Sequence, residues 1–102
     1  MKFFLCKLVP PRPTFAQDMT EAETKLMQEH VMYWTELAGR GIAVVFGPVA
    51  DPKGAWGVAI VEVEDEADAH ALAAIDPTIK SDRNFKFEIY SMPIAVLRKP
   101  AA

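Results

Sequence analysis

Cysteine is nearly absent from this chain, since Cys6 is the only one among its 102 residues. An intramolecular disulfide is therefore excluded, and the composition suits a reducing compartment, so we expect a cytoplasmic protein. Cys6 lies inside an apolar, strand-like segment, where we expect a buried and unreactive thiol. No two Cys or His residues have the spacing of metal ligands, so we expect no structural zinc site.

An excess of positive charge is also missing, because the net charge is −3. The only local basic cluster, Lys80, Arg83 and Lys86, is interrupted by Asp82, so we expect no nucleic-acid partner. No apolar run is long enough to span a bilayer, and Lys7 interrupts the apolar N-terminal segment before it reaches signal-peptide length. We therefore expect no membrane partner.

Apolar residues are plentiful, at 51% of the chain, and they fall into six periodic segments of one predicted domain. A capping box of Thr20 and Glu23 opens the first helix, which Gly39 and Gly41 end. Asp65 caps a second helix that ends at the Asp76-Pro77 pair. We expect strands at 2–9, 42–47, 55–63 and 85–91, loops at 10–18 and 78–84, and a domain over 1–92 with a tail at 93–102.

The order β-α-β-β-α-β predicts an α+β protein of the ferredoxin-like fold, with a four-stranded antiparallel sheet and both helices on one face. The first strand is apolar on both faces, and the run at 42–47 indicates a strand covered on both faces. One chain covers only one face of its sheet. We therefore expect the open face to meet a second copy, which makes the protein a homodimer.

His30 is the most informative residue, because it lies on the apolar stripe of the first helix, one turn after Leu26 and one turn before Trp34. A buried polar ring needs a partner, since leaving one unpaired costs about 1–3 kcal/mol. Histidine also exchanges protons near neutral pH. His30 is therefore either a structural histidine bonded to a backbone carbonyl or a general acid/base. His70 lies off the apolar stripe of its helix, so we expect it in solvent.

The predicted topology gathers the other unusual residues at one end of the molecule, near His30. Arg12 fits either an exposed loop or a bidentate contact to an anionic substrate. Asp51 is either a turn residue, as Asp commonly is before a proline, or the partner of His30. Asp76 either simply ends the helix before Pro77 or has a functional role, because the macrodipole disfavours a carboxylate at a helix C-terminus, which indicates a local partner or a use. Ser81 joins this end, and Trp34 and Phe46 are either core residues or a substrate platform.

Three motifs in their order and spacing resemble the YCII (YciI-like) family, over residues 2–92. The first is the helix motif from His30 through Tyr33, Trp34 and Leu37 to Gly41. The second is the hairpin Gly47-Pro48 with Asp51 and Gly54, and the third runs from Ala69 and Leu72 to Asp76-Pro77. The arginine-bearing PPRP loop is longer than the usual connection and Trp34 replaces a common leucine, so substrate identity does not transfer.

The resemblance implies a dimeric α/β barrel and a His–Asp pair, which here becomes His30 and Asp76. Some members of that family resemble muconolactone isomerase, and one branch is a dehydrochlorinase that acts on chlorinated hydroxyhydroquinones. Our leading hypothesis is a homodimeric lyase or isomerase that needs no cofactor, with His30 as general acid/base oriented by Asp76. The rival is a non-catalytic ligand-binding or accessory dimer with a structural histidine and no pocket. A third, resting on fold analogy, is a cofactor-free monooxygenase.

Overall fold

The computed structural model describes residues 1–100, which form four strands and four helices. In chain order they are β1 (Lys2–Val9), α1 (Phe15–Asp18), α2 (Glu21–Gly39), β2 (Ala43–Val49), β3 (Trp56–Val63), α3 (Glu66–Ala74), α4 (Pro77–Lys80) and β4 (Lys86–Met92). The strands form one antiparallel sheet in the order β2-β3-β1-β4. This is the predicted ferredoxin-like fold, and the prediction is confirmed.

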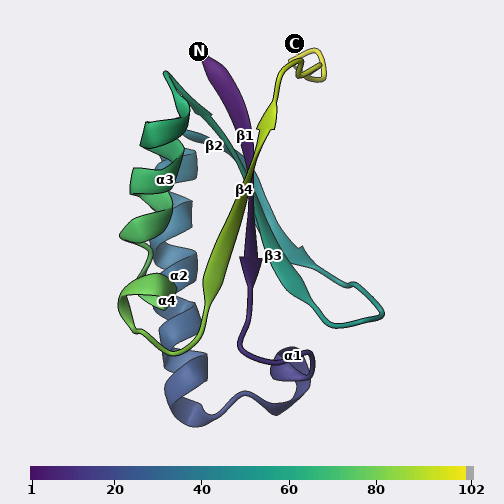
Figure 1. The fold of residues 1–102 in the computed structure, drawn as a ribbon, viewed down its shortest axis with the longest axis vertical. Helices are drawn as coiled ribbons and strands as arrows, with labels where there is room; N and C mark the ends of the chain where they lie inside the picture. The colour runs from purple at the N-terminus through teal and green to yellow at the C-terminus, as the bar shows by residue number, and fades with distance from the viewer. Residues whose placement is uncertain (101–102) are drawn as a thin grey trace.

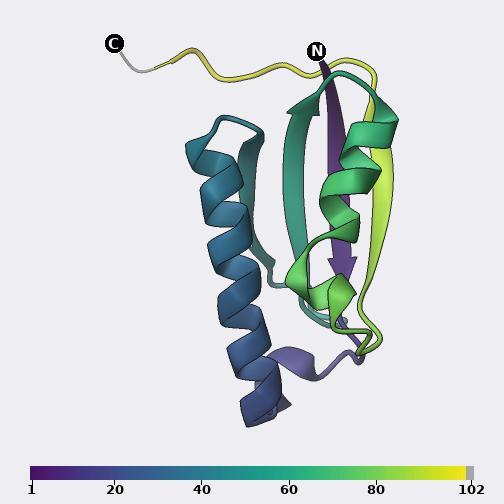
Figure 2. The same ribbon diagram turned by 90° about the vertical axis from the view of Figure 1, so that its left-hand side faces the viewer.

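The molecule has two layers, with α2 and α3 on one face of the sheet (Figures 1 and 2). Phe4, Cys6 and Leu8 of β1 point toward these helices and are buried. The register places Cys6 opposite Ala59 and Ile89, so one apolar layer runs across the three strands. Burial raises the pKa of the Cys6 thiol to about 11, which makes it a poor nucleophile at neutral pH.

The helix α2 begins where its sequence predicts. Thr20 accepts a hydrogen bond from the backbone N–H of Glu23, and the Glu23 carboxylate accepts one from the backbone N–H of Thr20. At the other end Gly41 has a φ of 78°, a left-handed conformation that glycine adopts without strain. In residues 1–100 no helix, α2 included, is both long and apolar enough to cross a membrane.

Two segments predicted as loops contain short helices. The first is α1, where the Phe15 ring packs edge-to-face on Phe85 with centroids 5.3 Å apart, so tertiary packing rather than a local cap fixes it. The second is α4, which begins directly at Pro77 because proline is favoured in the first helical turn. Asp76 therefore caps the N-terminus of α4, where a carboxylate is favoured, and the predicted conflict with a helix macrodipole is wrong.

The predicted burial of β2 on both faces is wrong for the single chain. Val44 and Val45 are 41% and 53% exposed, because β2 is an edge strand with a bulge between Ala43 and Val45. The turn after β2 does meet the first loop, since a Cβ on Gly54 would stand 2.9 Å from the Pro13 carbonyl oxygen. The Arg12 loop and the Asp51 turn thus lie at the same end of the sheet, as the topology predicts.

Candidate functional site

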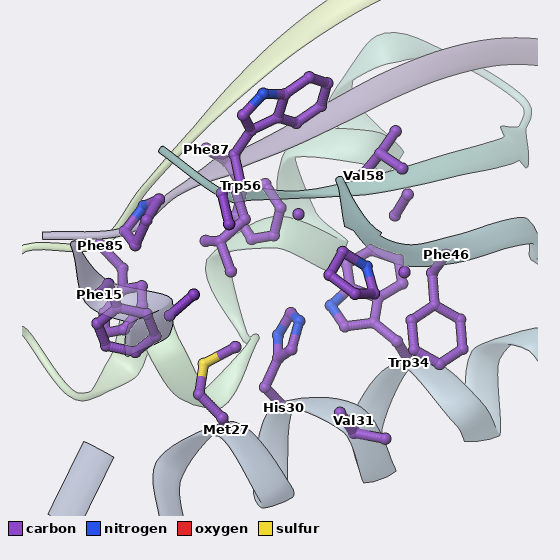
Figure 3. Close-up of a pocket in the computed structure, with 18 of the residues that line it drawn as sticks. Phe15, Met27, His30, Val31, Trp34, Phe46, Trp56, Val58, Phe85 and Phe87 are labelled. Carbon is purple, nitrogen blue, oxygen red and sulfur yellow. The ribbon is translucent and has the colours of Figure 1, made fainter. Parts of the chain in front are cut away.

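The helix α2 turns His30 toward the sheet. Glu23, Leu26, Trp34 and Leu37 are the buried residues of this helix, and His30 lies among them on the same face. The His30 side chain is 12% exposed, so it is neither in bulk solvent nor sealed in the core. Figure 3 shows its ring rising from the helix beside Met27 and Trp34.

Asp76 meets His30 from the junction of α3 and α4, and it is fully buried at 0% exposure. Its Oδ2 accepts hydrogen bonds from His30 Nδ1 at 2.8 Å and from Trp34 Nε1 at 2.6 Å. Its Oδ1 accepts from the backbone N–H and the hydroxyl of Thr78, at 2.8 and 2.7 Å. Both oxygens are therefore saturated by donors, as a buried carboxylate requires.

The ionisation of Asp76 determines which nitrogen of His30 carries a proton. Burial raises the pKa of Asp76, but the hydrogen bonds from His30, Trp34 and Thr78 outweigh burial and hold that pKa below its ordinary value. A carboxylate only accepts hydrogen bonds, so Nδ1 of His30 must be the donor. In the neutral ring Nε2 then carries the lone pair. Among residues 1–100, Nε2 has no protein partner, and it is not a buried unpaired atom, so it opens onto accessible space.

That space is a cavity of about 200 Å³ between α2 and the lower end of the sheet, and His30 lines it (Figure 3). Its other walls are almost wholly apolar. They come from α1, α2 and all four strands, or from residues directly beside these elements, and include Phe15, Met19, Met27, Val31, Trp34, Phe46, Phe85 and Phe87. The arrangement places one basic nitrogen at the wall of a half-open apolar cavity, where a bound ligand would replace much of the surrounding water.

Arg12 does not line this cavity, because its guanidinium is bound elsewhere. Nη1 and Nη2 donate to the two carboxylate oxygens of Glu23 at 2.9 and 2.7 Å, and Nε donates to Asp18 at 2.7 Å. These bonds, with one from the Thr20 backbone, lower the pKa of Glu23 to about 2. Arg12 thus fastens the segment that carries α1 to the start of α2, and α1 forms one wall of the cavity.

Asp51 and Ser81 also make local contacts outside the cavity lining. Asp51 accepts from the backbone N–H of Lys53 at 2.9 Å and from Trp56 Nε1 at 3.1 Å, which holds the hairpin turn. Ser81 donates to the Thr78 carbonyl at 2.6 Å at the end of α4. His30 therefore contacts Asp76 and not Asp51. His70 is exposed on α3 and pairs with Glu66, as expected.

The family model of the YCII-related domain matches residues 3–93 of this chain. The chain belongs to the YCII-related family. No curated protein matches it. The matched residues include all four helices, all of the four strands except Lys2, and both members of the His30–Asp76 contact, so the whole candidate site lies inside the YCII-related domain.

Within this YCII-related domain, the sequence predicted Trp34 and Phe46 as candidate lining residues, and both line the cavity. Phe85, Phe87 and Phe15 also line the cavity, and none of them was among the predicted site residues. Their shared signal is aromatic character at the end of the fold where the loop, the hairpin and α4 meet. Among residues 1–100, no three Asp, Glu, His or Cys side chains are grouped as metal ligands.

Proposed function

We propose that this protein is a small homodimeric enzyme of the lyase or isomerase type, which uses His30 as a general acid/base on a small cyclic or aromatic-derived substrate. The observation that carries the proposal is the 2.8 Å hydrogen bond from His30 Nδ1 to Asp76, with Nε2 directed into an apolar cavity. A carboxylate on Nδ1 fixes the tautomer and stabilises the charge that the ring gains when Nε2 takes a proton.

The reaction requires only proton movement by this chain's residues. Nε2 of His30 removes a proton from an acidic C–H of the substrate, and the released electron pair forms a carbon–carbon double bond. In an isomerase, an existing carbon–carbon double bond shifts, and its electron pair takes the proton back from the imidazolium at another carbon. In a lyase, a leaving group on the neighbouring carbon departs with its bonding pair, and the imidazolium gives its proton to the leaving group or to water. Neither reaction involves net oxidation or reduction, so the proposal includes no cofactor.

Proton exchange tests this proposal across several candidate substrates at once. The wild-type protein is incubated in D₂O with a panel of chlorinated hydroquinones and unsaturated lactones, and NMR records deuterium entering carbon positions. We expect exchange or turnover with a panel member and its loss in His30→Asn. That variant keeps an N–H near the position of Nδ1, so Asp76 retains a donor, but it has no base.

The matched control is His70→Asn, which changes the other histidine of the chain, exposed on α3. It should exchange as the wild type does. Activity that survives in His30→Asn contradicts a catalytic His30. Binding of panel members without any exchange supports the rival, a non-catalytic ligand-binding dimer. That rival predicted no cavity at His30, and the cavity there supports the catalytic proposal instead.

The homodimer in this proposal rests on the sheet face that α2 and α3 leave open (Figure 1). The register turns Leu5, Val58 and Ile60 to that face, with Val45 more than half exposed beside them. Contiguous apolar surface of this kind marks an interaction site. Light scattering should give twice the chain mass of 11.3 kDa. Leu5→Lys should give the single-chain mass, whereas Met32→Lys, on the exposed side of α2, should not.

A further inference from the structure

The cavity beside His30 has a single ionisable side chain among the residues 1–100 that line it, namely His30 itself. The indole N–H groups of the two tryptophans in the lining are already engaged, and the Trp56 ring itself lies on the sheet face opposite the helices. Trp34 Nε1 donates to Asp76 at 2.6 Å, and Trp56 Nε1 donates to Asp51 at 3.1 Å. A ligand in the cavity therefore meets one free polar atom of a side chain, Nε2 of His30.

Among residues 1–100, no lysine or arginine lines the cavity, so none is placed there to receive an anionic ligand. Arg12 directs its guanidinium to Asp18 and Glu23. The Lys7 ammonium lies 4.7 Å from the centre of the Trp56 ring, on the sheet face opposite the helices. An anion in the cavity would be desolvated without a counter-ion and would stand near the Asp76 carboxylate, and both effects oppose binding.

The size and walls of the cavity indicate the shape of the ligand. Its volume is about 200 Å³. An apolar protein cavity of about 150 Å³ is enough to bind benzene. The aromatic walls formed by Phe15, Trp34, Phe46 and Phe85 suit a flat ring by stacked or edge-to-face contacts. A single substituted ring fits this space.

We infer that the cavity takes an uncharged single-ring compound whose hydroxyl donates a hydrogen bond to Nε2 of His30, and that it rejects ring carboxylates. The inference deepens the proposed function, on which it rests for the role of His30 as proton acceptor. It also replaces the hypothesis that Arg12 binds an anionic substrate, because the Arg12 side chain instead holds α1 in the cavity wall.

Phenol and benzoate form a matched probe pair, since at neutral pH phenol is uncharged and benzoate is an anion of similar shape. Each is titrated into the wild-type protein while NMR follows the imidazole nitrogens. We expect phenol to bind in the millimolar range or tighter and to shift Nε2 of His30. Benzoate should bind at least tenfold more weakly. His70, exposed on α3, should shift with neither and serves as the internal reference.

A pair of alanine substitutions locates the binding. Ala16 is exposed on α1 and lines the cavity, so Ala16→Phe should fill its mouth and weaken phenol binding at least tenfold. Ala22 is exposed near the start of α2 outside the lining, so Ala22→Phe should leave binding unchanged. Both positions are on the surface, so both variants should keep the wild-type fold, which circular dichroism checks.

Benzoate binding as tightly as phenol, phenol binding unaffected by Ala16→Phe, or no phenol binding at all would each overturn the inference. These outcomes are separate from those of the proton-exchange experiment. If the protein selects phenol over benzoate but catalyses no proton exchange, the neutral-ring binding site is supported and the proposed enzymatic function is contradicted. If the protein catalyses proton exchange on an anionic ring substrate, the proposed enzymatic function is supported and the preference for neutral rings is contradicted.

Discussion

Two hydrogen-bonded side-chain pairs on one face of α2 differ in which of their nitrogen atoms remain free. Glu23 and His30 are about two helical turns apart, and each joins a partner from another element. Arg12 binds Glu23 through two nitrogens and Asp18 through the third, so each of its nitrogens is engaged. His30 binds Asp76 through Nδ1 alone and keeps Nε2 open to the cavity.

The difference shows why carboxylate partners alone do not identify a reactive site. The pKa of Glu23 and the pKa of Asp76 are both held below their ordinary values by donated hydrogen bonds. In the Arg12–Glu23 pair every guanidinium nitrogen already has an acceptor, so the pair only holds the Arg12 loop against the start of α2. The His30–Asp76 pair has one unsatisfied nitrogen beside an apolar volume, and that nitrogen can accept a proton from a bound molecule.

Among the changes that test this difference between the two pairs, removing Asp76 should have the largest effect, a loss of folding stability. Asp76→Ala leaves donors of His30, Trp34 and Thr78 buried without an acceptor, and each such donor costs about 1–3 kcal/mol. We expect the free energy of unfolding to fall by about 3 kcal/mol or more, measured by urea denaturation with tryptophan fluorescence.

The control for this prediction is Asp51→Ala. Asp51 also accepts from an indole, that of Trp56, but it is partly exposed and water can replace it. Its loss of stability should be clearly smaller than that of Asp76→Ala. Equal losses at the two positions would mean that burial and full saturation do not distinguish the Asp76 site from an ordinary turn aspartate.

Acid should weaken both pairs in the same direction. The folded pKa values of Glu23 and Asp76 are depressed, so as the pH falls the unfolded chain takes up these protons first. Their stabilisation is fully present above the ordinary carboxyl pKa and is lost as the pH falls toward about 2, the folded value for Glu23. The urea midpoint should therefore decrease steadily below about pH 4.5. A midpoint that stays constant there contradicts the depressed values.

Most of the fold follows from sequence periodicity, and the reason is visible in particular residues. Thr20 with Glu23 and Asp65 with Asp68 are local capping boxes, so the starts of α2 and α3 need no tertiary information. The short helix α1 was missed because Phe85, distant in the chain, holds Phe15 in place. The start of α4 was missed, although its sequence carries the signal, since Asp is a favoured N-cap and Pro is favoured at the first helical position.

The site was only partly predictable. An ionisable residue on an apolar stripe pointed to His30, and the family resemblance to Asp76, because both signals lie in short segments. The role of Arg12 was not readable, since its partners Asp18 and Glu23 follow a turn of the chain that only the folded loop defines. The cavity could not be predicted either, because it arises where residues of two helices and all four strands fail to fill the space between them.

Replacing Arg12 should act on the Glu23 pair and leave the His30 pair in place. In Arg12→Met the largest cause of the low Glu23 pKa is gone, so that pKa should rise from about 2 toward the ordinary 4.5. Carbon-detected NMR of the Glu23 carboxyl gives the value directly. The hydrogen bond between His30 and Asp76 should persist, as shown by an unchanged His30 nitrogen spectrum. A Glu23 pKa that stays near 2 would assign the effect to the Thr20 cap instead.

The smallest effect is a difference in proton position between the two histidines of the chain. His30 hydrogen-bonds a carboxylate through Nδ1, and His70 hydrogen-bonds Glu66 through Nε2. In alkaline buffer that leaves an ordinary imidazole neutral, long-range nitrogen–proton NMR should find the proton of His30 on Nδ1 and that of His70 on Nε2. Because His70 is exposed, its preference should weaken with added salt while that of His30 does not. A proton on Nε2 of His30 would leave no lone pair facing the cavity. The His30–Asp76 pair would then be no more reactive than the Arg12–Glu23 pair.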